Sequence, residues 1–140
     1  MKSVVVDASV IAAAFFPEAR SPAARAILAS GGGLYAPDLV YPEVANVIWK
    51  RRGRGEIDDA DAAELLADVL ALRLSITPSE QLLGAALALA LRTGRTVYDC
   101  LYLALAVETK TVMISDDRRL VNALARGPLK AHVGWLGDAR

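Results

Sequence analysis

Short apolar runs alternate with longer amphipathic segments along the chain, and this alternation predicts its secondary structure. Four short runs are predicted to be strands, and a fifth strand is predicted near the end of the chain: residues 3–6, 34–36, 74–76, 112–114 and 132–135. The segments between them repeat apolar residues at the three- and four-residue spacing of helices. Strands that alternate with helices favour right-handed crossovers and a parallel sheet covered on both faces. The expected fold class is therefore α/β, a three-layer α/β/α sandwich with a central parallel sheet.

Capping signals predict where two of the helices begin. The pair Pro37 and Asp38 predicts the start of one helix. Thr77 and Glu80 have the spacing of a capping box, which predicts a helix over residues 79–92 that is closed by a glycine at position 94.

Length and charge limit what the chain can be. Its 140 residues predict one domain, spanning residues 1–140. Lysine plus arginine and aspartate plus glutamate both number 16, so no overall basic field marks a nucleic-acid binder, and any such contact must come from local clusters. The hydrophobic fraction of 54% exceeds that of a typical domain, which predicts apolar surface for a partner in an oligomer or an obligate complex.

The cysteine content and the apolar stretches of the chain indicate its compartment and its relation to a membrane. The single cysteine, Cys100, cannot form an intramolecular disulfide and is expected to be a small buried hydrophobe. Asp7 interrupts the only stretch that resembles a signal peptide, so a cytoplasmic protein is expected. The longest uncharged apolar stretch, residues 82–91, is about half the length that a membrane-spanning helix needs, so no contact with a membrane is expected.

Four acidic residues stand at the edges of apolar segments: Asp7, Glu43, Asp99 and Asp117. Two of them follow predicted strands, and the other two lie in the opening turns of predicted helices. In an open parallel sheet these positions share the edge at which ligands collect, so the four side chains are expected to converge. Converging carboxylates repel one another and stay ionised only around a cation.

The type of ligand selects the metal. Oxygen ligands without cysteine or clustered histidine favour Mg²⁺ or Mn²⁺. Such an ion can activate a water and neutralise charge on a phosphodiester, so the sequence predicts hydrolysis of nucleic acid.

Simpler explanations remain open for several of these positions. Asp99 and Asp117 are placed where acidic residues cap helices for structural reasons alone. Ser9 and Ser115 have hydroxyls that would orient Asp7 and a neighbouring ligand or water, and both would serve equally as local turn caps.

The cationic residues also have two interpretations. The basic group at residues 50–54 is either a phosphate track or a complement to a helix carboxyl end, and we slightly favour the second. Arg118 and Arg119 stand beside the proposed metal edge and are the better candidates for the substrate backbone. The only histidine, His132, has an apolar setting that favours a structural role.

Four sequence segments resemble the PIN-domain family, and within it the toxin ribonucleases of VapBC toxin–antitoxin pairs. The segment VVVDASVI resembles the opening strand of that family, with Asp7 as the first metal aspartate and Ser9 as its accompanying hydroxyl. YAPDLVYPEVANVIWK is similar to the segment that supplies Glu43, and TVYDCLYLALA places Asp99 at the third acidic position.

The fourth segment, MISDDRRL, matches the family pattern of serine or threonine, any residue, then aspartate. This match makes Asp117 the ligand candidate after Ser115, while Asp116 is a surplus acid that competes for the same role. The resemblance implies a compact α/β/α fold, dependence on Mg²⁺ or Mn²⁺, and endonucleolytic cleavage of RNA. It also implies a homodimer and inhibition by a small antitoxin protein.

Two other functions compete with a metal-dependent ribonuclease. In the first, the acidic pocket is not catalytic and binds the basic tail of a partner protein through arginine–carboxylate pairs. In the second, the chain is a phosphoaspartyl enzyme or a receiver domain. Haloacid-dehalogenase-like phosphatases need a second aspartate two positions after the first, where this chain has Ser9, and receiver domains need paired acids and a late lysine that it lacks.

Overall fold

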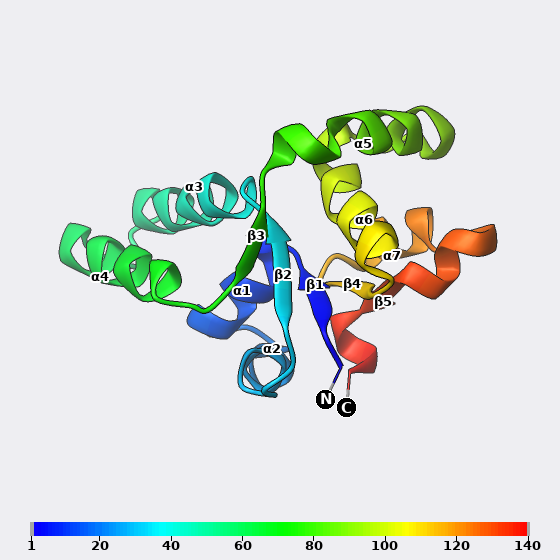
Figure 1. Ribbon diagram of the computed structural model, residues 1–140. Helices are drawn as coiled ribbons and strands as arrows, with labels where there is room; N and C mark the ends of the chain where they lie inside the picture. Colours follow the sequence, from blue (N-terminus) through cyan, green and yellow to red (C-terminus); the bar gives the residue numbers. More distant parts are fainter. Residues whose placement is uncertain (1, 140) are drawn as a thin grey trace.

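The computed structural model describes residues 2–139, and its centre is a sheet of parallel strands (Figure 1). The spatial order is β3-β2-β1-β4-β5. The strands are β1 (Val4–Val6), β2 (Leu34–Pro37), β3 (Ser75–Thr77), β4 (Val112–Ser115) and β5 (Val133–Trp135). Each of the five was predicted to within about a residue, and the predicted parallel arrangement is confirmed.

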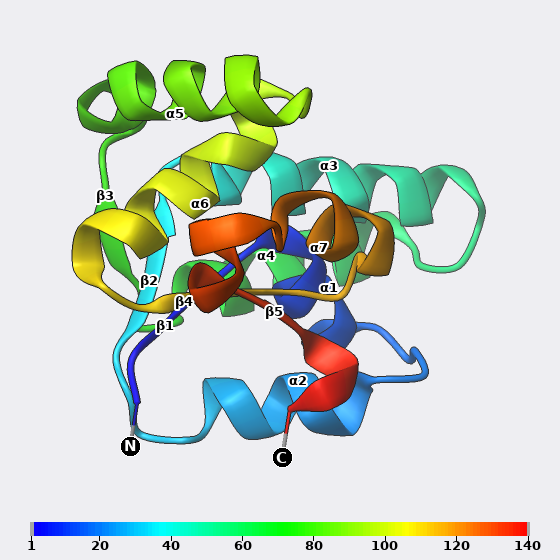
Figure 2. The same cartoon turned by 90° about the vertical axis from the view of Figure 1, so that its right-hand side faces the viewer.

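Helices cover both faces of this sheet, as the alternating pattern predicted. On one side lie α1 (Ala8–Phe15), α2 (Ser21–Leu28), α3 (Val40–Gly53) and α4 (Asp59–Leu70). On the other lie α5 (Ser79–Thr93), α6 (Val97–Thr109) and α7 (Arg118–Leu124), with α6 against the sheet and α5 outside it (Figures 1 and 2). Two short 3-10 helices, η1 (Gly127–His132) and η2 (Leu136–Asp138), flank β5.

Helix α6 is the most deeply buried helix on its side of the sheet. It contacts β1, β2 and β4 on one side and α5 on the other, so it is enclosed by two layers. Every residue from Cys100 to Ala106 is buried for this reason. The prediction that Cys100 is a small buried hydrophobe is confirmed, and burial raises the pKa of its thiol.

The start of α5 corrects two predictions from the sequence. The residue before the helix is Pro78, which supplies no side-chain cap, so the capping box expected from Thr77 is absent at this end. Instead, Asp38 accepts hydrogen bonds from the backbone N–H and the hydroxyl of Ser79. The helix predicted to start at Pro37 and Asp38 begins at Val40, and Asp38 does not cap it. Gly94 ends α5 in the left-handed conformation, as predicted.

Large apolar side chains remain on the surface of several helices. They include Leu83, Leu87 and Leu91 along α5, together with Trp49 on α3 and Leu70 on α4. The surplus of apolar surface predicted from the composition is therefore present in the fold. Within residues 2–139, no helix is both long and apolar enough to cross a lipid bilayer.

Candidate active site

Strand order places a topological switch point of the sheet beside β1. The chain leaves β1 toward β2 and β3 and returns on the other side of β1 to form β4, so the order of the strands reverses between β1 and β4. In open α/β sheets, ligands bind outside the carboxyl ends of the strands at such a reversal. Asp7 follows β1 and Ser115 ends β4, and the two strands pair up to Val6 and Ile114.

Asp7 is enclosed by hydrogen-bond donors at this point. Its Oδ1 accepts the backbone N–H of Ser9 at 3.0 Å and that of Val10 at 3.3 Å, so the carboxylate caps α1. The Ser9 hydroxyl donates to the same oxygen at 2.5 Å and lies 3.3 Å from the Ser115 hydroxyl. Ser9 also accepts the N–H of Asp116, while Ser115 accepts that of Asp117. Ser9 therefore orients Asp7 directly, Ser115 contacts Ser9, and both serines cap local turns.

The cost of burying Asp7 is visible in its acidity. The residue is 7% exposed, and desolvation raises the pKa of its carboxyl from 3.8 to about 6, although hydrogen bonds from Ser115 and Ser9 oppose the shift. A raised pKa at the carboxyl edge of a parallel sheet makes Asp7 a candidate for a functional carboxylate.

Glu43 reaches the same region from the first turn of α3. Its Oε1 accepts a hydrogen bond from the phenol hydroxyl of Tyr102, which is 2% exposed on α6. Burial raises the pKa of Glu43, and the negative charge of Asp99 raises it further. Burial also raises the pKa of Tyr102, and Glu43, Asp7 and Asp99 add to the shift, so the phenol stays protonated as a donor.

Asp99 lies one turn before Tyr102 on the same face of α6. The helix is capped by Thr96, whose hydroxyl accepts the N–H of Asp99, so Asp99 does not itself cap the helix. Its carboxylate is 3.5 Å from Nη2 of Arg95 and is 29% exposed. Of the three acids that raise the pKa of Tyr102, Glu43 contacts its hydroxyl, and Asp7 and Asp99 act through their charge.

The two acids after β4 have different partners. Asp117 caps α7 through an Oδ1 that accepts the N–H of Leu120 at 3.2 Å, and its side chain is otherwise exposed. Asp116 forms an ion pair with Nε of Arg20 and is 11% exposed. The structure brings Asp117 to the same sheet edge as Asp7, but its one recorded contact is the helix cap.

The arginines considered for contact with a substrate differ in whether they form ion pairs. Arg51 pairs with Glu18 and Glu56, and Arg52 pairs with Asp59, so the basic group at the end of α3 makes structural ion pairs. Arg118 and Arg119 are exposed in the first turn of α7.

His132 has a structural role, as the sequence predicted. Its Nδ1–H donates to the carbonyl of Thr111 at 2.8 Å. The ring therefore ties η1 to the residue before β4 and lies outside the acidic site.

The candidate ligands of a divalent ion are carboxylate oxygens. Within residues 2–139, no three acidic, histidine or cysteine side chains lie close enough together to enclose one ion. Mg²⁺ does not require this, since it keeps several waters and binds directly to only one or two carboxylates. Asp7, Glu43 and Asp99 supply oxygen atoms alone, two of them with raised pKa values that a cation would lower. The residues present fit a hydrated Mg²⁺ or Mn²⁺ ion.

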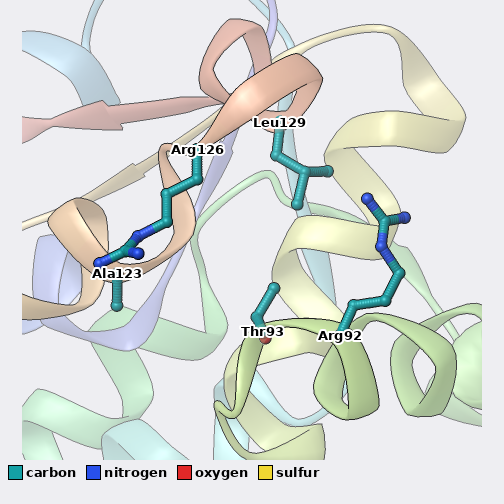
Figure 3. A pocket seen from close by; sticks show the side chains of 5 residues that line it. All are labelled: Arg92, Thr93, Ala123, Arg126 and Leu129. Atoms are coloured by element: carbon teal, nitrogen blue, oxygen red, sulfur yellow. The ribbon is translucent and has the colours of Figure 1, made fainter.

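A separate hollow of about 300 Å³ lies between the end of α5 and the α7–η1 segment (Figure 3). Arg92 and Arg126 line it, but their guanidinium groups do not point toward one another. None of the candidate acids lines this hollow, so it is not part of the site at the sheet edge.

Comparison with known proteins shows the family of the chain. The PIN domain family matches residues 4–125. The chain belongs to the PIN-domain family. This PIN-domain chain is 38% identical to ribonuclease VapC3 of Pyrobaculum aerophilum over 119 residues, which cover 84% of the chain and 91% of that protein.

Solved structures of similar proteins share the fold. The crystal structure of PAE2754 from Pyrobaculum aerophilum has a TM-score of 0.70 at 25% identity and covers 98% of this chain and 85% of its own. VapC20 of Mycobacterium tuberculosis, a toxin that cleaves the sarcin-ricin loop, has a TM-score of 0.65 at 18% identity over 91% of this chain and 93% of its own. VapBC2 of Rickettsia felis, bound to a promoter DNA fragment, has a TM-score of 0.61 at 11% identity. The match covers 95% of this chain and 98% of that chain. The last two are similar in fold alone.

Tyr102 and Trp135 were not among the candidate residues selected from the sequence, and both make contacts at this edge of the sheet. Tyr102 is buried, yet its hydroxyl binds Glu43. Its position three residues after Asp99 on one helix was a usable signal, because such residues share a face. Trp135 lies against two arginines, one of them distant in sequence, and no local pattern marks that contact.

Proposed function

We propose that this PIN-domain protein is a divalent-metal-dependent endoribonuclease that hydrolyses RNA phosphodiester bonds. Asp7, Glu43, Asp99 and Asp117 hold Mg²⁺ or Mn²⁺, directly or through water. A bound divalent ion supplies an activated water at neutral pH and neutralises charge on the phosphodiester. Ser9 and Ser115 orient the Asp7 carboxylate.

The observation that carries this proposal is the hydrogen bond from the buried Tyr102 hydroxyl to Glu43, at the sheet edge where Asp7 follows β1. Asp7, Glu43 and Asp99 come from three separate segments, and each raises the pKa of Tyr102. Packing alone does not require buried or half-buried anions at one edge of the sheet, because each costs desolvation energy. The similarity to ribonuclease VapC3 supports RNA as the substrate.

We further propose that the protein is the toxin of a type II toxin–antitoxin pair, that a small antitoxin inhibits it, and that it forms a homodimer. The similarity to VapC3 and to the VapBC2 complex supports this assignment. Exposed apolar side chains support a protein partner, since Trp49 is 70% exposed on α3 and Leu91 is 79% exposed on α5.

The test is cleavage of RNA by the purified protein and by a matched pair of variants. We expect Mg²⁺ or Mn²⁺ to support cleavage of single-stranded RNA, and both a chelator and Asp7→Asn to abolish it. Asp68→Asn removes one charge from the exposed surface of α4 and should cleave as the wild type does. Cleavage that survives both the chelator and Asp7→Asn would refute the proposal.

A metal titration followed by thermal melting separates the catalytic proposal from a peptide-binding pocket. If the carboxylates hold a cation, Mg²⁺ raises the melting temperature of the wild type and leaves that of Asp7→Asn nearly unchanged. If the pocket only accepts a basic peptide, neither protein responds to the metal and the ribonuclease proposal fails.

A further inference from the structure

A cluster of two arginines and a tryptophan borders the acidic site. The Arg118 guanidinium carbon lies 4.2 Å from the centroid of the Trp135 ring system, and that of Arg20 lies 5.2 Å from it. Cation–π contacts of this kind hold a guanidinium in place without using its N–H donors in conventional hydrogen bonds. We call Arg20, Trp135 and Arg118 the arginine–tryptophan cluster.

The cluster is tied to the site through the sheet. Trp135 ends β5 and pairs in register with Ser115 at the end of β4. The Ser115 hydroxyl is 3.3 Å from that of Ser9, which donates to Asp7. The tryptophan thus stands one strand away from the residues that orient Asp7, at the carboxyl edge where substrate would approach.

The position of the Trp135 ring is fixed by packing. Its indole N–H is buried and has no acceptor within residues 2–139, so no hydrogen bond of its own sets the ring. A Cβ atom on Gly137 would lie 2.3–2.5 Å from three atoms of the ring, which is far inside van der Waals contact. Only glycine at position 137 therefore lets the ring lie where it meets the arginines.

The two arginines differ in charge balance. Arg20 is neutralised by its ion pair with Asp116. Arg118 is exposed and has no ion pair within the described part of the chain. Arg118 is thus a cation held against Trp135 at the sheet edge that carries Asp7 and Asp117, whose charges would repel an RNA backbone.

We propose that the arginine–tryptophan cluster is a phosphate-binding subsite, in which Trp135 holds Arg118 ready to bind an RNA backbone phosphate beside the acidic site. This inference rests on the proposed ribonuclease function and adds to it a positioning role for Trp135 and Gly137. The gain comes from pre-organisation, because a guanidinium already held against a ring loses less side-chain freedom when it binds a phosphate. Arg119 is exposed in the same turn, but its charge has no such contact with the ring.

The experiment measures binding of a labelled single-stranded RNA oligonucleotide in Mg²⁺ by fluorescence anisotropy, in an Asp7→Asn background that prevents cleavage. We expect Arg118→Ala to weaken binding about 10-fold and to reduce the salt dependence by roughly one phosphate contact. Arg119→Ala removes the same charge from the same turn and should weaken binding less than about 3-fold.

Gly137→Ala tests the ring without changing any charge. It displaces Trp135 and should weaken RNA binding, as Arg118→Ala does. If Gly137→Ala is unfolded at the temperature of the binding experiment, Trp135→Leu serves as a second variant. In the cleavage-competent protein, Arg118→Ala should raise KM about 10-fold and change kcat less than about 3-fold.

Two outcomes overturn the inference, and they differ from failure of the proposed function. Equal losses for Arg118→Ala and Arg119→Ala would mean that only overall charge matters. If the Gly137→Ala and Trp135→Leu variants fold and bind RNA as tightly as the protein without these substitutions, the ring has no role. If the wild type cleaves RNA in either case, the ribonuclease proposal stands. If the wild type neither binds nor cleaves RNA with Mg²⁺, both proposals fail.

Discussion

The phenol hydroxyl of Tyr102 donates a hydrogen bond to Oε1 of Glu43 and so joins α6 to α3 across the candidate site. The donor is fixed, because Tyr102 is 2% exposed within the layer that packs on the sheet. The acceptor lies on α3, which is part of the connection from β2 to β3, whereas Tyr102 lies on α6, which precedes β4. The hydrogen bond therefore determines which way the Glu43 carboxylate faces.

Tyr102→Phe should weaken metal binding while the fold is retained. Residues that orient a ligand typically change metal affinity 10- to 100-fold, so we expect the Mg²⁺ concentration for half-maximal thermal stabilisation to rise roughly 10-fold. Tyr98→Phe is the matched control, since Tyr98 lies on the same helix and is 63% exposed. Equal behaviour of the two variants in the metal titration would contradict an orienting role for Tyr102.

Asp7 should make the metal-free protein less stable as the pH rises. Its pKa is 3.8 ordinarily and about 6 in the fold, so between these values the folded chain binds more protons than the unfolded chain. The free energy of unfolding then falls as pH rises through this window, by roughly 3 kcal/mol in total, and the loss is complete above it.

Asp7→Asn removes this titration and keeps an oxygen that accepts from Ser9. Without metal, the variant should therefore melt several degrees above the wild type at pH 7.5 and close to it at pH 4. Melting curves at the two pH values measure the difference. A shift of the same size at both would rule out desolvation of Asp7 as its cause.

Substitution of Asp116 should lower the stability of the fold, whereas substitution of Asp117 should lower RNA cleavage. Asp116→Asn breaks the pair with Arg20 and should cost about 1 kcal/mol of stability while cleavage of RNA continues. Asp117→Asn keeps a residue that caps α7, so stability should hold while metal-dependent cleavage falls at least 10-fold. Denaturant melts and cleavage rates of both variants measure this, and the reverse pattern would make Asp116 the fourth acid.

Asp38 should stabilise the fold from outside the site. Its carboxylate accepts two hydrogen bonds from Ser79, and these hold its pKa below the ordinary value. The stability that it adds is therefore present above the unfolded pKa and is lost as pH falls through the lower folded pKa. Asp38→Ala should cost about 1 kcal/mol at pH 7, measured by urea unfolding, with RNA cleavage unchanged. Asp68→Ala, on the exposed surface of α4, is the comparison at equal charge.

Local patterns in the sequence were sufficient for the elements and for much of the site. The valine run before Asp7 predicted a buried strand with a carboxylate at its end, because a parallel strand is buried on both faces and its loop lies at the edge. Ser9 and Ser115 were selected for the same reason, since hydroxyls beside such a carboxylate are close enough to orient it. Their contact with one another across β1 and β4 follows from the strand pairing.

The errors fall where a side chain binds a distant segment. The start of α5 was assigned to Thr77 because a capping box is a local pattern, whereas Asp38 supplies the cap across the end of β2 and β3. Asp116 was treated as a surplus acid because the family pattern assigns the ligand to Asp117, and its pair with the distant Arg20 had no local signal in the sequence.

The sequence by itself determined the alternation of strands and helices, the parallel sheet and the acidic residues at its carboxyl edge. These follow from spacing and burial, which act over a few residues. Only the tertiary structure decided which side chains meet, namely Tyr102 with Glu43, Asp116 with Arg20, and Trp135 with Arg118. Such contacts depend on the order of the strands and the packing of the layers, and hydrophobic spacing along the chain carries no information about either.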